Sequence, residues 1–205
     1  MSERRRLGIL LSGRGSNFLA IAEGIAQGRL PNAEIAIVLS NRSDAAGITA
    51  ARNAGFVAQV IEPQGRKRAE HDAEIVANLQ AHQVDLVCLA GYMRLLSPAF
   101  VRAFPQRILN IHPSLLPAFP GLDAQKQALA YGVAVTGCTV HFVDEELDHG
   151  VIVLQKTVEV LPEDDEHALS TRILRQEHQA YTEAIERVLS GKYSVIGRRY
   201  LPKSV

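Results

Sequence analysis

Short apolar runs alternate with amphipathic segments along the first half of the chain, and this alternation limits the possible folds more than any other feature. After the first four runs, apolar residues recur at the three- and four-residue spacing of a helix. The runs themselves are nearly continuous, so we expect strands buried on both faces, as in parallel sheets. These patterns predict an α/β protein with a doubly wound, mostly parallel sheet. The predicted strands cover 6–12, 33–40, 57–61, 85–91 and 107–111, and the predicted helices cover 16–27, 45–54, 66–82 and a short turn from Pro98.

The second half has a different pattern, which predicts an antiparallel extension of the sheet. A loop and a short helix over 121–131 precede a run at 137–143 that alternates like a half-buried strand. A polar turn then leads into a strand at 151–160, which we expect to run antiparallel to the strand before it. A long amphipathic helix over 166–189 and a short tail complete the chain.

Composition argues against several classes of protein. The 205 residues include 22 lysines and arginines and 22 aspartates and glutamates, so the formal net charge is zero, whereas nucleic-acid binders normally have a basic surplus. No segment approaches the roughly 20 apolar residues that span a bilayer. Cys88 and Cys138 lie in apolar segments, so we interpret them as buried thiols of a reducing compartment. We therefore expect a cytoplasmic protein without nucleic-acid or membrane partners.

Because no linker or repeat interrupts the chain, we expect a single domain over 1–205, with halves at 1–105 and 106–205.

The glycine-containing loop SGRGSN joins the first predicted strand to the first predicted helix. Its glycines permit a tight turn, and the new helix offers unpaired backbone N–H groups, which together favour an anion such as a phosphate. A dinucleotide fingerprint would need a third glycine where Phe18 stands, and a P-loop would need a lysine, so a monophosphate on a small substrate fits better. The alternative is a simple turn in which Ser16 caps the helix.

Asn110 and His112 lie two positions apart at the end of the fifth predicted strand, so their side chains share one face. In doubly wound sheets, ligands bind beyond the carboxyl ends of the strands. Asp148 lies in a polar turn, and a carboxylate near an imidazole would fix its tautomer and favour its charged form. An amide, an imidazole and a carboxylate suit acyl transfer, in which donors stabilise a developing oxyanion.

Three other interpretations of these polar residues remain open. A histidine at a strand end is often satisfied by a backbone carbonyl, and an aspartate in a turn often serves only the turn. A metal could be held by His112, His141 and Asp148. The sequence lacks HxxxH or CxxC spacing, however, so we expect no metal.

The chain resembles the phosphoribosylglycinamide formyltransferases, folate-dependent enzymes of purine synthesis. The resemblance runs over nearly the whole chain, through the segments LLSGRGSNFLAI, LAGYMRLLSPAF, LNIHPSLLPAFPG, VHFVDEELDHG and RQEH. It implies a Rossmann-like formyltransferase fold and transfer of a formyl group from 10-formyltetrahydrofolate to the amine of glycinamide ribonucleotide. The first half would bind the phosphate, and the second half would bind the folate and carry out catalysis.

The resemblance also implies roles for individual residues. Asn110 and His112 would hold the oxyanion, with His112 as proton donor, and Asp148 would keep His112 charged and relay protons through water. The substrate phosphate would be held by Gly15, Ser16 and Asn17, and the ribose hydroxyls by Glu177. The folate pocket would be lined by Asn110, Arg68, Met93, Arg94, Leu95, Leu96, Asp144, Glu145, Glu146, Leu147 and Asp148.

Without the resemblance, simpler interpretations of three of these sites would be preferred. The Met93–Leu96 segment would be core packing, Glu177 would lie on a solvated helix face, and Arg68 would be an ordinary surface charge. The 121–132 loop departs from the family because Asp123 and Gln125 stand where related proteins often have histidines, so its closing behaviour and pH response are open.

Related activities are the main alternatives. A methionyl-tRNA formyltransferase would have an additional carboxyl-terminal domain and a basic surface, and a formyltetrahydrofolate hydrolase would have an additional amino-terminal domain. A nucleotide-binding module without catalysis would use the glycine loop alone. We expect a monomer or a homodimer.

Overall fold

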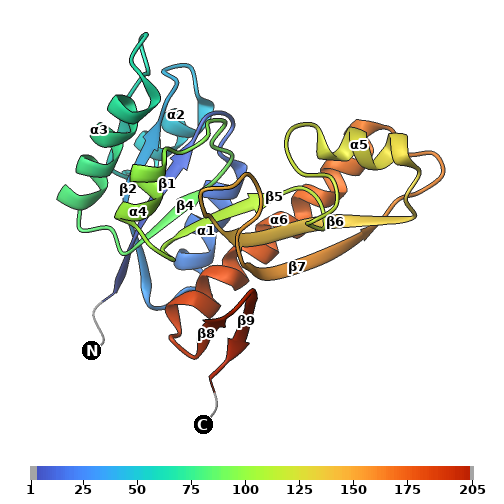
Figure 1. Ribbon diagram of the computed structural model, residues 1–205. Coiled ribbons are helices and arrows are strands. Elements are labelled where there is room, and N and C mark those ends of the chain that lie inside the picture. The colour runs from blue at the N-terminus through green and yellow to red at the C-terminus, as the bar shows by residue number, and fades with distance from the viewer. Residues whose placement is uncertain (1–3, 204–205) are drawn as a thin grey trace. The chain divides into compact units, whose positions relative to one another are not determined.

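Parallel strands form the first of the two units into which the chain divides, Met1–Leu109 and Asn110–Val205. The computed structural model describes residues 4–203 (Figure 1). The strands of the first unit have the order β3-β2-β1-β4, and each neighbouring pair is parallel. In chain order its elements are β1 (Arg5–Leu11), α1 (Ser16–Ala26), β2 (Ala33–Ser40), α2 (Ala46–Asn53), β3 (Ala58–Val60), α3 (Arg68–Ala81), β4 (Leu86–Leu89) and α4 (Pro98–Ala103).

Helices cover both faces of this parallel sheet, as the contacts of β1 demonstrate. A Cβ added at Gly8 would lie 2.5 Å from the Leu79 side chain of α3, so the helix approaches this face closely. A Cβ added at Gly47 of α2 would lie 2.8 Å from the side chain of Leu11. Because Gly8 and Leu11 point to opposite faces of the strand, α3 and α2 lie on opposite sides of β1.

The second unit continues from β5 (Ile108–His112), the strand that crosses the boundary between the units. Here β6 lies next to β5, and β7 pairs with β6 in antiparallel register. The long helix α6 lies along both strands (Figure 1) and buries Leu169, Ile173, Tyr181 and Ile185. The remaining elements are α5 (Ala124–Tyr131), β6 (Val135–Phe142), β7 (Ile152–Glu159), α6 (Glu166–Leu189), β8 (Tyr193–Ile196) and β9 (Arg199–Pro202).

The end of the chain differs from the predicted short tail. Residues 193–202 form the antiparallel hairpin β8–β9, which reverses at Gly197, a residue with φ 60°. The rings of Tyr193 and Tyr200 stack across the hairpin with their centroids 5.3 Å apart. The tail prediction was wrong because the stabilising contact is a pair of aromatic rings brought together only when the turn forms.

The predicted fold class is confirmed: a mostly parallel α/β sheet with flanking helices and an antiparallel extension. Every strand and helix expected from the apolar pattern is present, with ends displaced by only a few residues. Within residues 4–203, no helix is both long enough and apolar enough to cross a membrane. The expectation of a single domain stays a prediction.

Candidate active site

The end of β5 carries two of the three residues singled out as catalytic. His112 is buried and Asn110 is half-buried. Asp148 comes from the turn between β6 and β7, and its Oδ2 atom lies 3.4 Å from Nδ1 of His112. The side chains of His112 and Asp148 are only 6% and 7% exposed, so little water screens this pair. The fold thus brings together an imidazole and a carboxylate that spacing along the chain could not connect.

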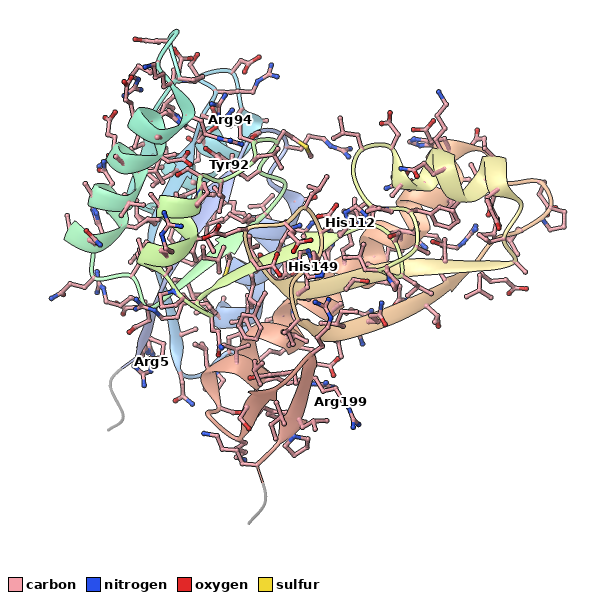
Figure 2. The ribbon with its side chains drawn as sticks, in the orientation of Figure 1. Arg5, Tyr92, Arg94, His112, His149 and Arg199 are labelled. Atoms are coloured by element: carbon pink, nitrogen blue, oxygen red, sulfur yellow. The ribbon has the colours of Figure 1, made fainter. Side chains whose placement is uncertain are left out.

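The imidazole of His112, labelled in Figure 2, is flanked by an acceptor on each side. Its Nε2 atom lies 2.9 Å from the carbonyl oxygen of Phe119, while Nδ1 faces the Asp148 carboxylate. Both ring nitrogens therefore face an oxygen that can accept a hydrogen bond, and these two contacts hold the ring in one orientation.

Backbone constraints aim the carboxylate of Asp148. This residue has a φ of 49°, in the left-handed region that costs an L-residue about 1–2 kcal/mol. The backbone N–H of Gly121 donates to Asp148 Oδ2 at 2.8 Å. Nearby, a Cβ added at Gly150 would lie 1.8 Å from the carbonyl oxygen of Phe142, so only glycine fits there. The tight turn and the Gly121 bond together hold the carboxylate against His112.

His141 of β6 is a further member of the cluster, which the sequence suggested only as a metal ligand. Its Nε2 atom lies 3.3 Å from Nδ2 of Asn110 and 3.8 Å from Oδ1 of Asp148. Its Nδ1 lies 2.8 Å from the carbonyl oxygen of Phe142, which accepts the ring proton. Burial lowers the pKa of His141 and outweighs the opposing attraction of Asp148. The ring is thus neutral, and Nε2 accepts from the Asn110 amide, which orients that amide. The available signal was a lone histidine inside an apolar alternating run.

The lowered pKa of His141 predicts a loss of stability in mild acid. As the pH falls below the ordinary value of 6.5, the unfolded chain binds a proton at this position before the folded chain does. The free energy of unfolding therefore decreases as the pH decreases. We expect His141→Gln to have a smaller decrease in unfolding free energy than the wild type between pH 7.5 and 5.5, measured by urea denaturation. Asp164 and Glu183 also have lowered pKa values, but carboxylates lose their contribution at more acidic pH.

A matched control for this measurement is His167→Gln, because His167 is exposed on α6. Its pH dependence should follow that of the wild type. Equal acid-induced losses in the wild type and His141→Gln would contradict the assignment of a neutral, buried ring.

The glycine loop leads into α1 without a side-chain cap. The residue at the N-cap of α1 is Gly15, with φ 75° and no side-chain capping bond, so the alternative in which Ser16 caps the helix is wrong. A Cβ added at Gly15 would lie 2.7 Å from Cα of Gly47, and the backbone N–H of Gly47 donates to the Gly13 carbonyl at 3.0 Å. Close packing of two backbones thus requires glycine here. Gly15, Ser16 and Asn17 therefore surround an uncapped helix start, whose first N–H groups suit an anion.

The segment Met93–Leu96, which follows β4, is not core packing, contrary to the simpler interpretation. Met93 is 70% exposed and Leu95 is 56% exposed, although both are large apolar residues. Arg94 and Leu96 are partly buried. Figure 2 shows Tyr92 and Arg94 in this part of the chain. An exposed apolar segment at the end of a parallel strand lies where ligands bind in doubly wound sheets.

The turn that contains Asp148 is tied to the end of the chain. His149 Nδ1 lies 2.9 Å from Oδ2 of Asp144, and the guanidinium of Arg198, at the tip of the β8–β9 hairpin, donates to His149 Nε2 at 2.9 Å. Arg198 also donates to the carbonyl oxygen of His149 at 2.6 Å. The predicted donor-binding residues Glu145, Glu146 and Leu147 are exposed in the same turn. This turn is therefore anchored at one end while its middle remains accessible.

Two other predicted residues have contrasting environments. Glu177 of α6 is only 7% exposed, so the alternative of a solvated helix face was wrong. Burial, followed by the charge of Glu177, raises the pKa of the Cys138 thiol to about 12. Arg68 is exposed at the start of α3, where a surface charge is the simplest interpretation. The ligand-binding roles of both residues stay predictions.

The loop before α5 is connected to the catalytic cluster by Gly121, the donor to Asp148. Asp123 stands at the N-cap of α5 with a φ of 56°. Gln127 donates to the carbonyl oxygens of Pro120 and Leu122 at 3.1 and 2.8 Å. Among residues 4–203, no group of three or more histidine, cysteine or acidic side chains has an arrangement that could hold a metal ion.

Comparison with known proteins identifies the family. Residues 5–185 match the family model described as formyl transferase. The chain is 39% identical to the phosphoribosylglycinamide formyltransferase of Haemophilus influenzae, over 98% of this chain and 97% of that protein. It is 46% identical to the trifunctional purine biosynthetic protein adenosine-3 of Drosophila melanogaster, over 92% of this chain, but it spans only 14% of that protein's length.

A solved structure gives the same result. The glycinamide ribonucleotide transformylase 1 of Symbiobacterium toebii superposes with a TM-score of 0.96 at 49% identity, covering 100% of this chain and 96% of that one. Agreement at this level extends through the β8–β9 hairpin, which lies beyond the residues that the family model matches. The chain belongs to the formyl transferase family, among the relatives of the phosphoribosylglycinamide formyltransferases.

Proposed function

We propose that this protein is a phosphoribosylglycinamide formyltransferase of de novo purine biosynthesis. It transfers the formyl group of 10-formyltetrahydrofolate to the amine of glycinamide ribonucleotide. The observation that carries this proposal is the buried contact between His112 and Asp148, beside Asn110, in a chain of the formyl transferase family. These three side chains supply what formyl transfer needs: an uncharged donor, a proton donor and a carboxylate that lies against the proton donor.

The reaction proceeds through a tetrahedral intermediate. The substrate amine attacks the formyl carbon, and the carbonyl oxygen becomes an oxyanion that accepts hydrogen bonds from the Asn110 amide and from His112, whose Nε2 exchanges the carbonyl oxygen of Phe119 for the oxyanion. Collapse then breaks the bond between the formyl carbon and N10 of the folate. The proton lost by the amine reaches N10 through water and the His112–Asp148 pair, so tetrahydrofolate leaves as a neutral amine.

The phosphate of the acceptor substrate is bound by the glycine loop. Gly15, Ser16 and Asn17 supply backbone N–H groups, a hydroxyl and an amide at the uncapped start of α1. Glu177 binds the ribose hydroxyls, a role in which a carboxylate accepts two hydrogen bonds.

The formyl donor is bound by three further groups of residues. Exposed apolar side chains and the backbone of the Met93–Leu96 segment line the pocket. Residues of the 144–148 turn contact the folate, and Asn110 contacts its formyl group. Arg68, an exposed cation, fits a carboxylate of the folate's glutamate tail.

Several wider features belong to the same proposal. Asn110 and His112 stabilise the oxyanion, so no step requires a metal. The enzyme works as a single formyltransferase domain, with a phosphate-binding half at 1–105 and a folate-binding, catalytic half at 106–205, as a monomer or a homodimer. We place it in the cytoplasm, where reduced, buried thiols such as those of Cys88 and Cys138 persist.

One assay tests the proposed function against its alternatives. The purified protein is incubated with glycinamide ribonucleotide and 10-formyltetrahydrofolate, and released tetrahydrofolate is followed by absorbance. We expect release only when the amine substrate is present. Release without the amine would identify a hydrolase, and no release under either condition would identify a binding module, so either result would contradict formyl transfer to this acceptor.

A further inference from the structure

The segment Met93–Ser97 is fixed at both ends by buried side chains of the first unit. At one end, Oγ of Ser12, which follows β1, accepts the backbone N–H of Met93 at 2.8 Å. At the other end, Oδ2 of Asp72, on α3, accepts the backbone N–H of Ser97 at 2.6 Å. Two different elements therefore set where this segment begins and ends.

Between these anchors, the backbone is left available. Within residues 4–203, the peptide groups of Arg94, Leu95 and Leu96 form no hydrogen bond with the rest of the chain. The side chains of Met93 and Leu95 are exposed. Unpaired peptide groups next to exposed apolar side chains form a surface that can both contact a flat ring and hydrogen-bond its edge.

Both anchors are built into the interior. Ser12 is 5% exposed and Asp72 is 1% exposed. The Ser12 hydroxyl donates its own proton to Oδ1 of Asn41 at 2.5 Å, which leaves an oxygen lone pair directed at Met93. The Asp72 carboxylate accepts its hydrogen bond from Ser97 in a buried place, where a hydrogen bond is stronger than in water.

The second anchor also fixes the element that follows. Ser97 is the N-cap of α4, and its hydroxyl accepts the backbone N–H of Phe100 at 3.4 Å. Asp72 therefore couples α3 to the segment and to α4.

We propose that Ser12 and Asp72 are positioning residues that preset the Met93–Ser97 backbone as a strip for the heterocyclic ring of the formyl donor. This inference rests on the proposed function and extends it to two residues that do not touch the reacting atoms. A loop ordered before the ligand arrives binds more tightly than one that must be ordered by it, because the conformational entropy is already lost. The anchors act on donor binding and leave the chemical step unchanged.

Kinetics of paired variants test this inference. We expect Ser12→Ala and Asp72→Ala each to raise KM for 10-formyltetrahydrofolate by about tenfold, with kcat at saturating donor and KM for glycinamide ribonucleotide changed by less than about twofold. Titration calorimetry with a stable 5,8-dideaza analogue of the donor should give the same loss of affinity. Ser12→Thr and Asp72→Asn each retain an acceptor oxygen, so they should recover most of the affinity.

Matched controls come from the same unit. Ser43 and Asp44 lie between β2 and α2, and their side chains bond to Glu62 and Arg42. Ser43→Ala and Asp44→Asn should leave both KM values unchanged. Amide hydrogen exchange should accelerate at Met93 in Ser12→Ala and at Ser97 in Asp72→Ala, and it should stay near the wild-type rate in Ser12→Thr and Asp72→Asn, which keep the acceptor. This readout needs no substrate, and if Asp72→Ala does not fold, the two Ser12 variants still provide it at Met93.

Three results would overturn the inference while the proposed function stands: wild-type donor KM in the folded anchor variants, equal increases of KM for both substrates, or unchanged exchange at Met93 and Ser97. Failure of the proposed function has a different signature, since the wild-type protein itself would then release no folate in an amine-dependent reaction.

Discussion

Asp148→Asn is expected to lower kcat for formyl transfer by about 10²–10⁴-fold, the range of a lost general acid–base function, while the fold remains intact. Asparagine has the shape of aspartate, tolerates the left-handed φ of 49°, and can still accept the Gly121 N–H. What is lost is the negative charge 3.4 Å from Nδ1 of His112. Without that charge the proton donor loses the partner that the turn holds against it, so the defect should appear in kcat.

Steady-state kinetics over pH 5.5–9 would measure the effect, together with urea denaturation to verify folding. Asp165→Asn is a matched control, because Asp165 is the N-cap of α6 and asparagine caps helices equally well. This control should have wild-type rates. Wild-type rates at every pH in Asp148→Asn would remove the carboxylate from the mechanism.

Asn110→Ala is expected to lower kcat by about 10²–10³-fold, the usual effect of removing one oxyanion donor. The Nδ2 group of Asn110 is oriented by Nε2 of His141 at 3.3 Å, so its donor is held in place before the oxyanion forms. The hydrogen bond from the Asn110 amide to the formyl oxygen strengthens as negative charge develops on that oxygen. The loss should therefore appear in kcat, with KM for either substrate changed only slightly.

Initial rates at saturating concentrations of both substrates would measure this loss. Asn78→Ala, on the surface of α3, removes an amide of the same size whose partner is the Glu74 carbonyl, and it should retain full activity. A variant of Asn110 whose whole defect lay in KM for the donor would show that this amide binds the ground state alone, which contradicts an oxyanion role.

Local sequence patterns predicted most of the fold correctly because the buried parallel strands are short apolar runs with a helical pattern between them. The long helix α6 begins at Glu166 and ends at Leu189, as its amphipathic spacing predicts. The patterns failed where a single contact decides the structure. Tyr193 and Tyr200 are seven positions apart, and no periodicity announces that their rings stack to form a hairpin.

The candidate site was predictable only in the part that depends on residues close together in the chain. Asn110 and His112 share a face of β5 because alternation along a strand is a local property. The position of Asp148 depends on the pairing of β6 with β7 and on a turn that only glycine at 150 permits. His141 was undervalued because its importance comes from the strand beside which it lies, β5, and from burial that lowers its pKa.

By itself the sequence determined the order of strands and helices, the glycine loop at the start of α1, and the shared face of an amide and an imidazole, because each is set by residues close together in the chain. Only the tertiary structure decided which nitrogen of His112 meets Asp148, which side chain orients Asn110, and how Ser12 and Asp72 hold the ends of the Met93–Ser97 segment. These contacts join residues tens of positions apart, and their strength comes from burial, which exists only once the chain has folded.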